Sequence, residues 1–113
     1  MDKLRHISIA VPDVQATAAF YENTFGLERV KENERIICLS DGTINVTLTR
    51  PMDLDSTACK DFVGVHHLGF VAEDKKATGD RLKAGGGRMD DGKCWDPNSI
   101  MVNISDTYWV GSK

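Results

Sequence analysis

The chain has 113 residues, of which 41% are hydrophobic and 27% are charged, and its formal net charge is −3. This length supports a single domain with its own core, and the ordinary composition excludes disordered, collagen-like and coiled-coil chains. No apolar run approaches the roughly 18 residues of a membrane span, and residues 1–6 lack the apolar core of an export signal. Lys and Arg form no cluster of the kind that binds phosphates. We therefore expect a cytoplasmic protein with no membrane or nucleic-acid partner.

The cysteines indicate neither a zinc site nor a redox pair. Cys38, Cys59 and Cys94 are an odd number and are widely spaced, and no C-x-x-C motif is present. In a reducing cytoplasm we expect all three to be free thiols.

The sequence repeats itself once. Residues 6–13 align with residues 67–74 at an offset of 61, and residues 42–48 align with residues 98–104 at an offset of 56. The second copy is therefore five residues shorter between its helix and its last strand. Two copies are too few for a solenoid, so they indicate a pseudo-symmetric pair. We predict one domain over residues 1–113, with module one at 1–50, a polar linker at 51–63 and module two at 64–113.

Each copy is predicted to form a strand, a helix and three further strands. Apolar residues alternate over residues 6–11, which is typical of a half-buried strand. Asp13 is a suitable N-cap for a helix that Gly26 ends, and Phe20 is expected to face the sheet. Strands are predicted at 27–30, 35–39 and 44–49. The second copy gives a strand at 65–71, a helix at 74–84, and short strands near 88, 93 and 100–104.

A unit of this kind covers one face of its sheet with a helix and leaves the other face bare. We predict an α+β fold in which two βαβββ modules in tandem form a curved mixed sheet with an open cup. Strand alternation places His6 and His67 on the cup face, whereas His66 is expected on the opposite face. The predicted lining of a substrate pocket shares the parity of His6 and His67, and consists of Ser8, Asn45, Thr47, Gly69, Met101 and Asn103.

Several stretches resemble the vicinal oxygen chelate superfamily, the glyoxalase, bleomycin-resistance and extradiol-dioxygenase group. They are residues 5–13, the helix pattern of residues 19–27 that ends in Phe-Gly-Leu, the His-His-x-x-Phe motif within residues 64–70, and residues 96–100. The resemblance covers essentially the whole chain, and is greatest to small single-unit members. It implies paired βαβββ modules with a divalent metal in the cup and two positions open to the oxygens of a substrate.

The resemblance also implies where a metal would be held. One ligand near the start of each copy maps onto His6 and His67, which suit Zn, Ni, Co, Fe or Mn. The second pair of ligands, usually Glu or Gln, maps onto Thr47 and Asn103. These are weaker ligands, and neither can act as the general base that a family Glu supplies. The sequence therefore identifies no catalytic base.

Two classes of function follow from this. The first is a glyoxalase-like, metal-dependent enzyme, a lyase, isomerase or dioxygenase, acting on a small carbonyl or thioester substrate. The alternative is a metal-free small-molecule binding protein of the bleomycin-resistance type. We also expect a homodimer, in line with the superfamily. The apolar residues 107–113, which include Trp109, are expected to dock on their own sheet or on a partner subunit.

Overall fold

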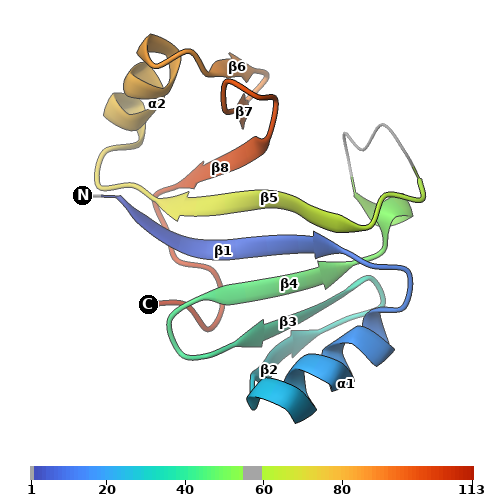
Figure 1. The fold of residues 1–113 in the computed structure, drawn as a ribbon. Helices are drawn as coiled ribbons and strands as arrows, with labels where there is room; N and C mark the ends of the chain where they lie inside the picture. The colour runs from blue at the N-terminus through green and yellow to red at the C-terminus, as the bar shows by residue number, and fades with distance from the viewer. Residues whose placement is uncertain (1, 55–59) are drawn as a thin grey trace.

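The computed structural model describes residues 2–54 and 60–113, which form one eight-stranded sheet, two α-helices and a short 3-10 helix (Figure 1). The first half contains β1 (Lys3–Ala10), α1 (Val14–Phe25), β2 (Glu28–Glu32), β3 (Ile36–Ser40), β4 (Asn45–Thr49) and η1 (Pro51–Asp53). The second half contains β5 (Gly64–Val71), α2 (Lys75–Ala84), β6 (Arg88–Asp90), β7 (Lys93–Trp95) and β8 (Met101–Ser105).

The order of the strands reproduces the sequence repeat. It is β2-β3-β4-β1-β5-β8-β7-β6, so the first strands of the two halves lie side by side at the centre. β4 runs parallel to β1 and β8 runs parallel to β5, whereas β1 and β5 are antiparallel to each other. The predicted α+β class, with a mixed sheet built from two βαβββ units, is confirmed.

Both helices begin at the aspartates that the sequence indicated. The Asp13 carboxylate accepts a hydrogen bond from the Ala16 amide at 2.9 Å, and Asp74 does the same for Ala77 at 3.1 Å. Each bond satisfies an amide that has no partner within the helix. α1 ends at Gly26, whose φ of 72° is the left-handed conformation that glycine adopts at low cost.

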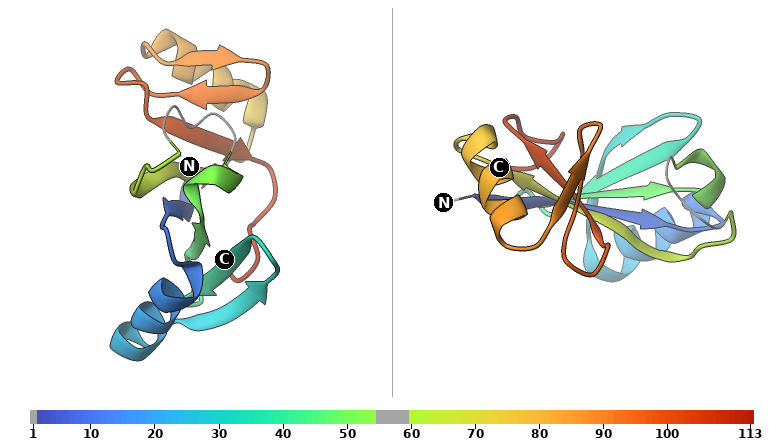
Figure 2. Two further views of the ribbon diagram at one scale, coloured as in Figure 1. Left: turned by 90° about the vertical axis from the view of Figure 1, so that its right-hand side faces the viewer. Right: turned by 90° about the horizontal axis from the view of Figure 1, so that it is seen from above.

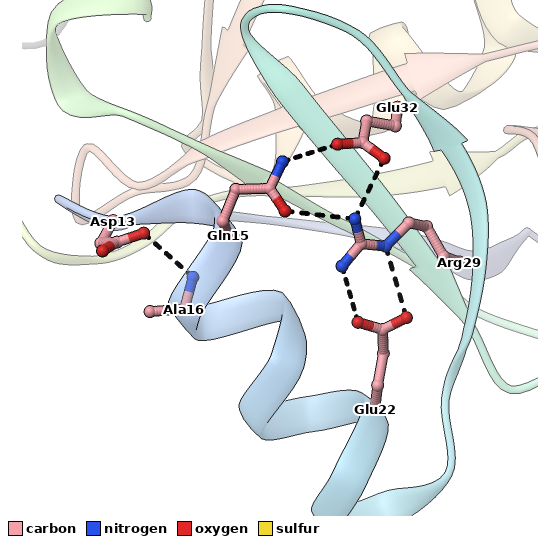
Figure 3. A network of polar contacts seen from close by, with 6 residues as sticks. All are labelled: Asp13, Gln15, Ala16, Glu22, Arg29 and Glu32. Carbon is pink, nitrogen blue, oxygen red and sulfur yellow. Dashed lines mark hydrogen bonds and ion pairs between the residues drawn. The ribbon is translucent and has the colours of Figure 1, made fainter.

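A polar network holds α1 to the edge strand β2 (Figure 3). The Arg29 guanidinium donates two bonds to the Glu22 carboxylate, at 2.7 and 3.3 Å, and a third to Glu32 at 3.0 Å. Gln15 completes the network through its bonds with Glu32 and Arg29. The paired bonds to Glu22 fix the angle of α1 on the sheet more firmly than one exposed ion pair would.

The core lies between α1 and the helix-facing side of module one. Its buried cluster consists of Val11, Ala18, Ile37, Leu39 and Leu48. On α1 this side is occupied by Val14, Ala18 and Tyr21, which follow helical spacing. The expectation for Phe20 was wrong: its side chain is 55% exposed, because the helix turns it away from the sheet.

Two β-bulges interrupt the central pair of strands. The register of β1 against β5 shifts between Leu4 and His6, and again between Ser8 and Ile9, where β5 carries the extra residue His66. The extra residue of the first bulge is Arg5, so the two bulges are themselves 61 positions apart. A bulge places two successive residues opposite one and redirects their side chains. Each bulge immediately precedes one of the two cup-face histidines.

The C-terminal segment, residues 106–113, leaves β8 and crosses to module one. It passes behind β1 and β4, on the side of the sheet away from α1 (Figures 1 and 2). The Ser40 hydroxyl donates to the Gly111 carbonyl at 2.6 Å, and the Lys113 amide donates to the Thr43 carbonyl at 3.1 Å. The cup face of module one is therefore covered by the chain itself.

Cys38 and Cys94 are free and buried, and Cys59 lies outside the described residues. Within residues 2–54 and 60–113, neither helix has the length and apolar character needed to traverse a bilayer.

Candidate functional site

Two histidines meet at the centre of the sheet. His6 on β1 and His67 on β5 come from equivalent points of the repeat, and their Nε2 atoms are 3.1 Å apart. The ring centroids are 5.1 Å apart, with 46° between the planes. Both nitrogens point at the same small volume on the cup face, as the repeat and the strand alternation predicted.

Asn45 holds His6 from the neighbouring strand. β4 and β1 pair in register so that Asn45 lies directly beside His6, and its Oδ1 is 2.7 Å from His6 Nδ1. The Asn45 Nδ2 donates to the Val110 carbonyl at 2.8 Å, and Thr47 Oγ1 donates to Asn45 Oδ1 at 2.7 Å. Asn45 and His6 are only 1% and 4% exposed, so these bonds replace water that neither residue can reach.

Strand alternation predicted that the side chain of His66 points away from His67. This prediction is wrong. Its Nδ1 is 2.8 Å from the Nδ1 of His67, and the two rings meet edge to face. The reason is the bulge, in which His66 is the extra residue and its side chain is redirected towards its neighbour. The site therefore contains three imidazoles rather than two.

The hydrogen bonds define a direction along this chain of rings. Because a carbonyl only accepts, Val110 fixes the Asn45 amide with Nδ2 towards itself and Oδ1 towards His6. His6 must then carry its proton on Nδ1, which leaves a lone pair on Nε2. His67 donates to that lone pair from its Nε2–H, and accepts at Nδ1 from the Nδ1–H of His66. Three neutral imidazoles satisfy every bond of the chain.

Burial favours these neutral forms. Desolvation, assisted by repulsion from His6 and His66, lowers the pKa of His67 to about 4. Desolvation also lowers the pKa of His6, against the opposing effect of the Asn45 bond, and lowers the pKa of His66. All three rings are therefore uncharged at neutral pH, which is the state that binds metals.

Four further predicted pocket residues lie on β1, β4 and β8. Thr47 bonds both Asn45 and the Cys38 thiol, at 3.3 Å from Sγ. Ser8 is buried, and it pairs with Thr47 on one side and His67 on the other. On β8, Met101 pairs with His67 and Asn103 pairs with Gly69. In the described parts of the chain, no hydrogen bond joins Met101 or Asn103 to the imidazoles.

Gly69 has a steric role that its place in the predicted lining did not indicate. A Cβ built there would lie 2.7 Å from His6 Cβ and 2.7 Å from the Trp109 ring. The indole of Trp109 stacks on the His6 ring, with centroids 4.7 Å apart and planes within 4°. The sequence predicted that residues 107–113, which include Trp109, dock either on their own sheet or on a partner subunit. The structure places it against His6.

The Nε2 atoms of His6 and His67 are placed so that they could supply two of the ligands of a divalent metal. Metal–nitrogen bonds of about 2.0–2.1 Å bring two adjacent ligands to roughly 3 Å from each other, which is the spacing of the two Nε2 atoms. Each ring also has a partner at its other nitrogen, as ligating histidines usually do. Across residues 2–54 and 60–113, no group of three or more His, Cys, Asp or Glu side chains forms a metal cluster.

The sequence matches one family along nearly its whole length. Residues 3–107 match the Glyoxalase/Bleomycin resistance protein/Dioxygenase superfamily. An ethylmalonyl-CoA/methylmalonyl-CoA epimerase of Cereibacter sphaeroides is 31% identical over 99 residues, covering 77% of this chain and 73% of that protein. The uncharacterized protein YqjC of Bacillus subtilis is 32% identical over 81 residues, which cover 63% of this chain and 58% of that protein. The chain belongs to the glyoxalase superfamily, as its sequence resemblance indicated.

Solved structures agree with this assignment at the level of the fold. A methylmalonyl-CoA epimerase of Streptomyces coelicolor, in complex with 2-nitronate-propionyl-CoA, has a TM-score of 0.69 at 22% identity, over 93% of this chain and 98% of that one. A hypothetical protein of Bacillus halodurans has a TM-score of 0.71 at 19% identity, over 91% and 92% of the two chains. Both share the overall fold of this chain over more than nine-tenths of its length.

Proposed function

We propose that this protein is a divalent-metal-dependent isomerase or lyase that acts on a small carbonyl or thioester substrate. The observation that carries the proposal is the convergence of His6 Nε2 and His67 Nε2 at 3.1 Å, at equivalent points of the repeat. The epimerase relative supports the isomerase class and a thioester as the substrate.

In this proposal His6 and His67 would hold the ion through Nε2. When bound, the ion supplies Lewis-acid polarisation of the substrate carbonyl oxygen. Asn45 Oδ1 keeps the proton of His6 on Nδ1, so that its Nε2 lone pair is available. His67 must then carry its proton on Nδ1 and donate it to the Nδ1 of His66. The His66 ring is left with an Nε2–H, a donor for a substrate oxygen.

Thr47 and Asn103 limit the chemistry that we propose. Both are neutral, and Thr47 Oγ1 is already engaged by Asn45 and Cys38. Neither would offer an ion a carboxylate ligand, and neither provides a carboxylate base. The proton next to the carbonyl would then pass to solvent water, and its removal is expected to be slower than in a member with glutamates at both positions.

Isotope exchange tests this proposal. The Co²⁺- or Zn²⁺-reconstituted protein is incubated with methylmalonyl-CoA in D₂O, and deuterium at the carbon next to the thioester is followed by NMR. We expect exchange above the background rate, lost in His6→Ala and His67→Ala. Exchange equal in the wild type and in both variants would contradict the proposal.

A metal-free binding protein is the second proposed function. The observation that favours it is the hydrogen-bonded chain from His66 to Asn45, which satisfies all its members without an ion. Here we expect a small oxygenated ligand to raise the melting temperature of the metal-free protein by mass action, with no isotope exchange. If added metal is required for that rise, the binding-protein alternative is wrong.

Homodimer formation also stays a proposal. Phe20 and Phe25 of α1 are 55% and 64% exposed, and their rings meet edge to face at 6.2 Å. Large aromatic side chains of this kind are enriched at subunit interfaces. Sedimentation at micromolar concentration is expected to give twice the chain mass of 12.5 kDa, and a species of the single chain mass would contradict a dimer.

A further inference from the structure

The C-terminal segment, residues 106–113, contacts His6 and Asn45 of the site directly. From Trp109 onwards it contacts module one through a ring stack on His6 and three hydrogen bonds. Two of these bonds are donated by buried side chains, from Asn45 to the Val110 carbonyl and from Ser40 to the Gly111 carbonyl. The third is the backbone bond between Lys113 and Thr43. Asn45 and Ser40 lie on β4 and β3, on the same face as His6. Module two thereby reaches back to the histidine of module one.

Two glycines make room for this segment. Gly69 leaves the space in which the Trp109 ring lies against His6. Gly111 has a φ of +79°, and a Cβ there would lie 2.9 Å from the Ser40 Cβ. A side chain at either position would push the segment off the sheet, so both close approaches depend on glycine.

The contacts of the segment act on His6 in two ways. The Val110 carbonyl orients the Asn45 amide, and the amide in turn determines which His6 nitrogen carries the proton. The Trp109 indole lies parallel to the His6 ring, with centroids 4.7 Å apart, and blocks rotation of that ring. One contact therefore sets the tautomer and the other sets the orientation.

We propose that residues Trp109–Gly111 are a positioning element that holds His6 with its proton on Nδ1 and its Nε2 lone pair directed at His67. Asn45 is then a positioning residue and not a metal ligand. The value of this arrangement for metal binding rests on the function proposed above, whereas the tautomer itself does not.

The tautomer is measured directly by long-range ¹H–¹⁵N correlation NMR of the ¹⁵N-labelled, metal-free protein at pH 7.5. We expect His6 to show a protonated Nδ1 and an unprotonated Nε2. Asn45→Ala removes the acceptor, so we expect His6 to become a mixture of both tautomers. Asn45→Asp keeps an acceptor for Nδ1 but cannot donate to Val110, so we expect the tautomer to persist while the Trp109 resonances lose their contacts with His6.

Trp109→Ala tests the ring stack, and Trp95→Ala is its matched control. Trp95 lies on β7 under the Arg88 guanidinium, and β8 lies between β7 and β5, the strand that carries His67. We expect line broadening or a mixed tautomer at His6 in Trp109→Ala, and a wild-type His6 in Trp95→Ala. Trp109→Phe retains an aromatic ring and should restore the wild-type pattern, even if the alanine variant fails to fold.

A protonated Nε2 on His6 in the wild type would overturn the proposal. So would a His6 tautomer and line width that are unchanged in both Asn45→Ala and Trp109→Ala. A Co²⁺ titration of the same samples separates this proposal from the proposed function. If the wild type binds no Co²⁺ but shows the expected tautomer and its loss, the positioning role stands and the metal site fails. If it binds Co²⁺ with an unaffected tautomer in every variant, the positioning role fails and the metal site stands.

Discussion

Replacing Gly69 by alanine should destabilise the protein, although the same change favours most strands. Glycine in a strand interior is ordinarily the weaker choice, so propensity alone predicts a gain. In this structure the added methyl group would lie 2.7 Å from both His6 Cβ and the Trp109 ring. His6 Cβ cannot retreat, because β1 is paired on both sides by β4 and β5. The Trp109 side chain must therefore move.

The cost of that movement can be estimated from the contacts it breaks. Losing the stack on His6 costs about 0.5–1.5 kcal/mol, and losing the two side-chain hydrogen bonds to the segment costs about 1 kcal/mol each. We expect the free energy of unfolding to fall by about 2.5–3.5 kcal/mol. In urea, where small proteins lose roughly 1–3 kcal/mol per molar denaturant, the midpoint should fall by roughly 1–3 M.

Gly79→Ala in α2 is the matched control. A Cβ there meets only the flexible end of Met89, at 3.3 Å, and alanine gains about 1 kcal/mol of helix propensity. We expect this variant to be at least as stable as the wild type. A Gly69→Ala protein with a wild-type urea midpoint would refute the close packing of Gly69, His6 and Trp109.

Three further results are expected. Because the folded state lowers the pKa of His67 from 6.5 to about 4, the unfolded chain takes up this proton first as the pH falls. The free energy of unfolding should thus be retained above about pH 7 and decline between pH 6.5 and 4, by about 2 kcal/mol after allowance for the partial exposure of the ring. Urea titrations of His67→Gln should show a smaller decline over this range. A decline equal to that of the wild type would contradict the role of His67. Asn103→Glu places a carboxylate at the position onto which the sequence resemblance maps a metal ligand, and should tighten Co²⁺ binding at least about 10-fold by calorimetry, since a carboxylate is a better ligand than an amide. Unchanged affinity would contradict the mapping of a ligand onto Asn103. Asp13→Ala removes the cap of α1 and should cost about 1 kcal/mol in urea unfolding, as should Asp74→Ala for α2, whereas Asp13→Asn should cost little.

Much of the architecture follows from local sequence patterns and from the repeat. The caps at Asp13 and Asp74 and the stop at Gly26 are set by residues within one helical turn. The meeting of His6 and His67 follows from the offset of 61, because equivalent positions of paired modules face each other across the pseudo-symmetry axis. These features depend on short-range chemistry or on self-similarity, both of which a single sequence displays.

The direction of the His66 side chain could not be predicted from strand alternation. A bulge changes the face of the sheet that a side chain occupies. Counting alternate residues through the bulge therefore assigns its extra residue to the wrong face. One signal was present in the sequence: Arg5-His6 and His66-His67 are pairs of successive polar residues inside otherwise alternating strands, in both copies. Two adjacent polar residues at the same point of a repeat are a reason to expect a bulge there.

The docking of residues 109–113 was predictable only in outline. The apolar residues of the segment indicate that it packs against another surface. Which surface this is depends on contacts between residues about 40 to 70 positions apart, such as Gly69 with Trp109 and Ser40 with Gly111. Asn45 illustrates the same limit. Its parity placed it on the cup face, whereas its role as a link between Val110 and His6 depends on the position of the segment.

The most direct test of the account is a Co²⁺ titration of the purified chain, followed by the visible absorption of the bound ion. We predict one ion per chain, and loss of that binding in both His6→Ala and His67→Ala, with unchanged binding in Trp95→Ala, which changes a side chain on β7, two strands from β5. A wild-type chain that takes up no ion, or uptake that survives the removal of either imidazole, would contradict a metal shared between the two halves of the repeat.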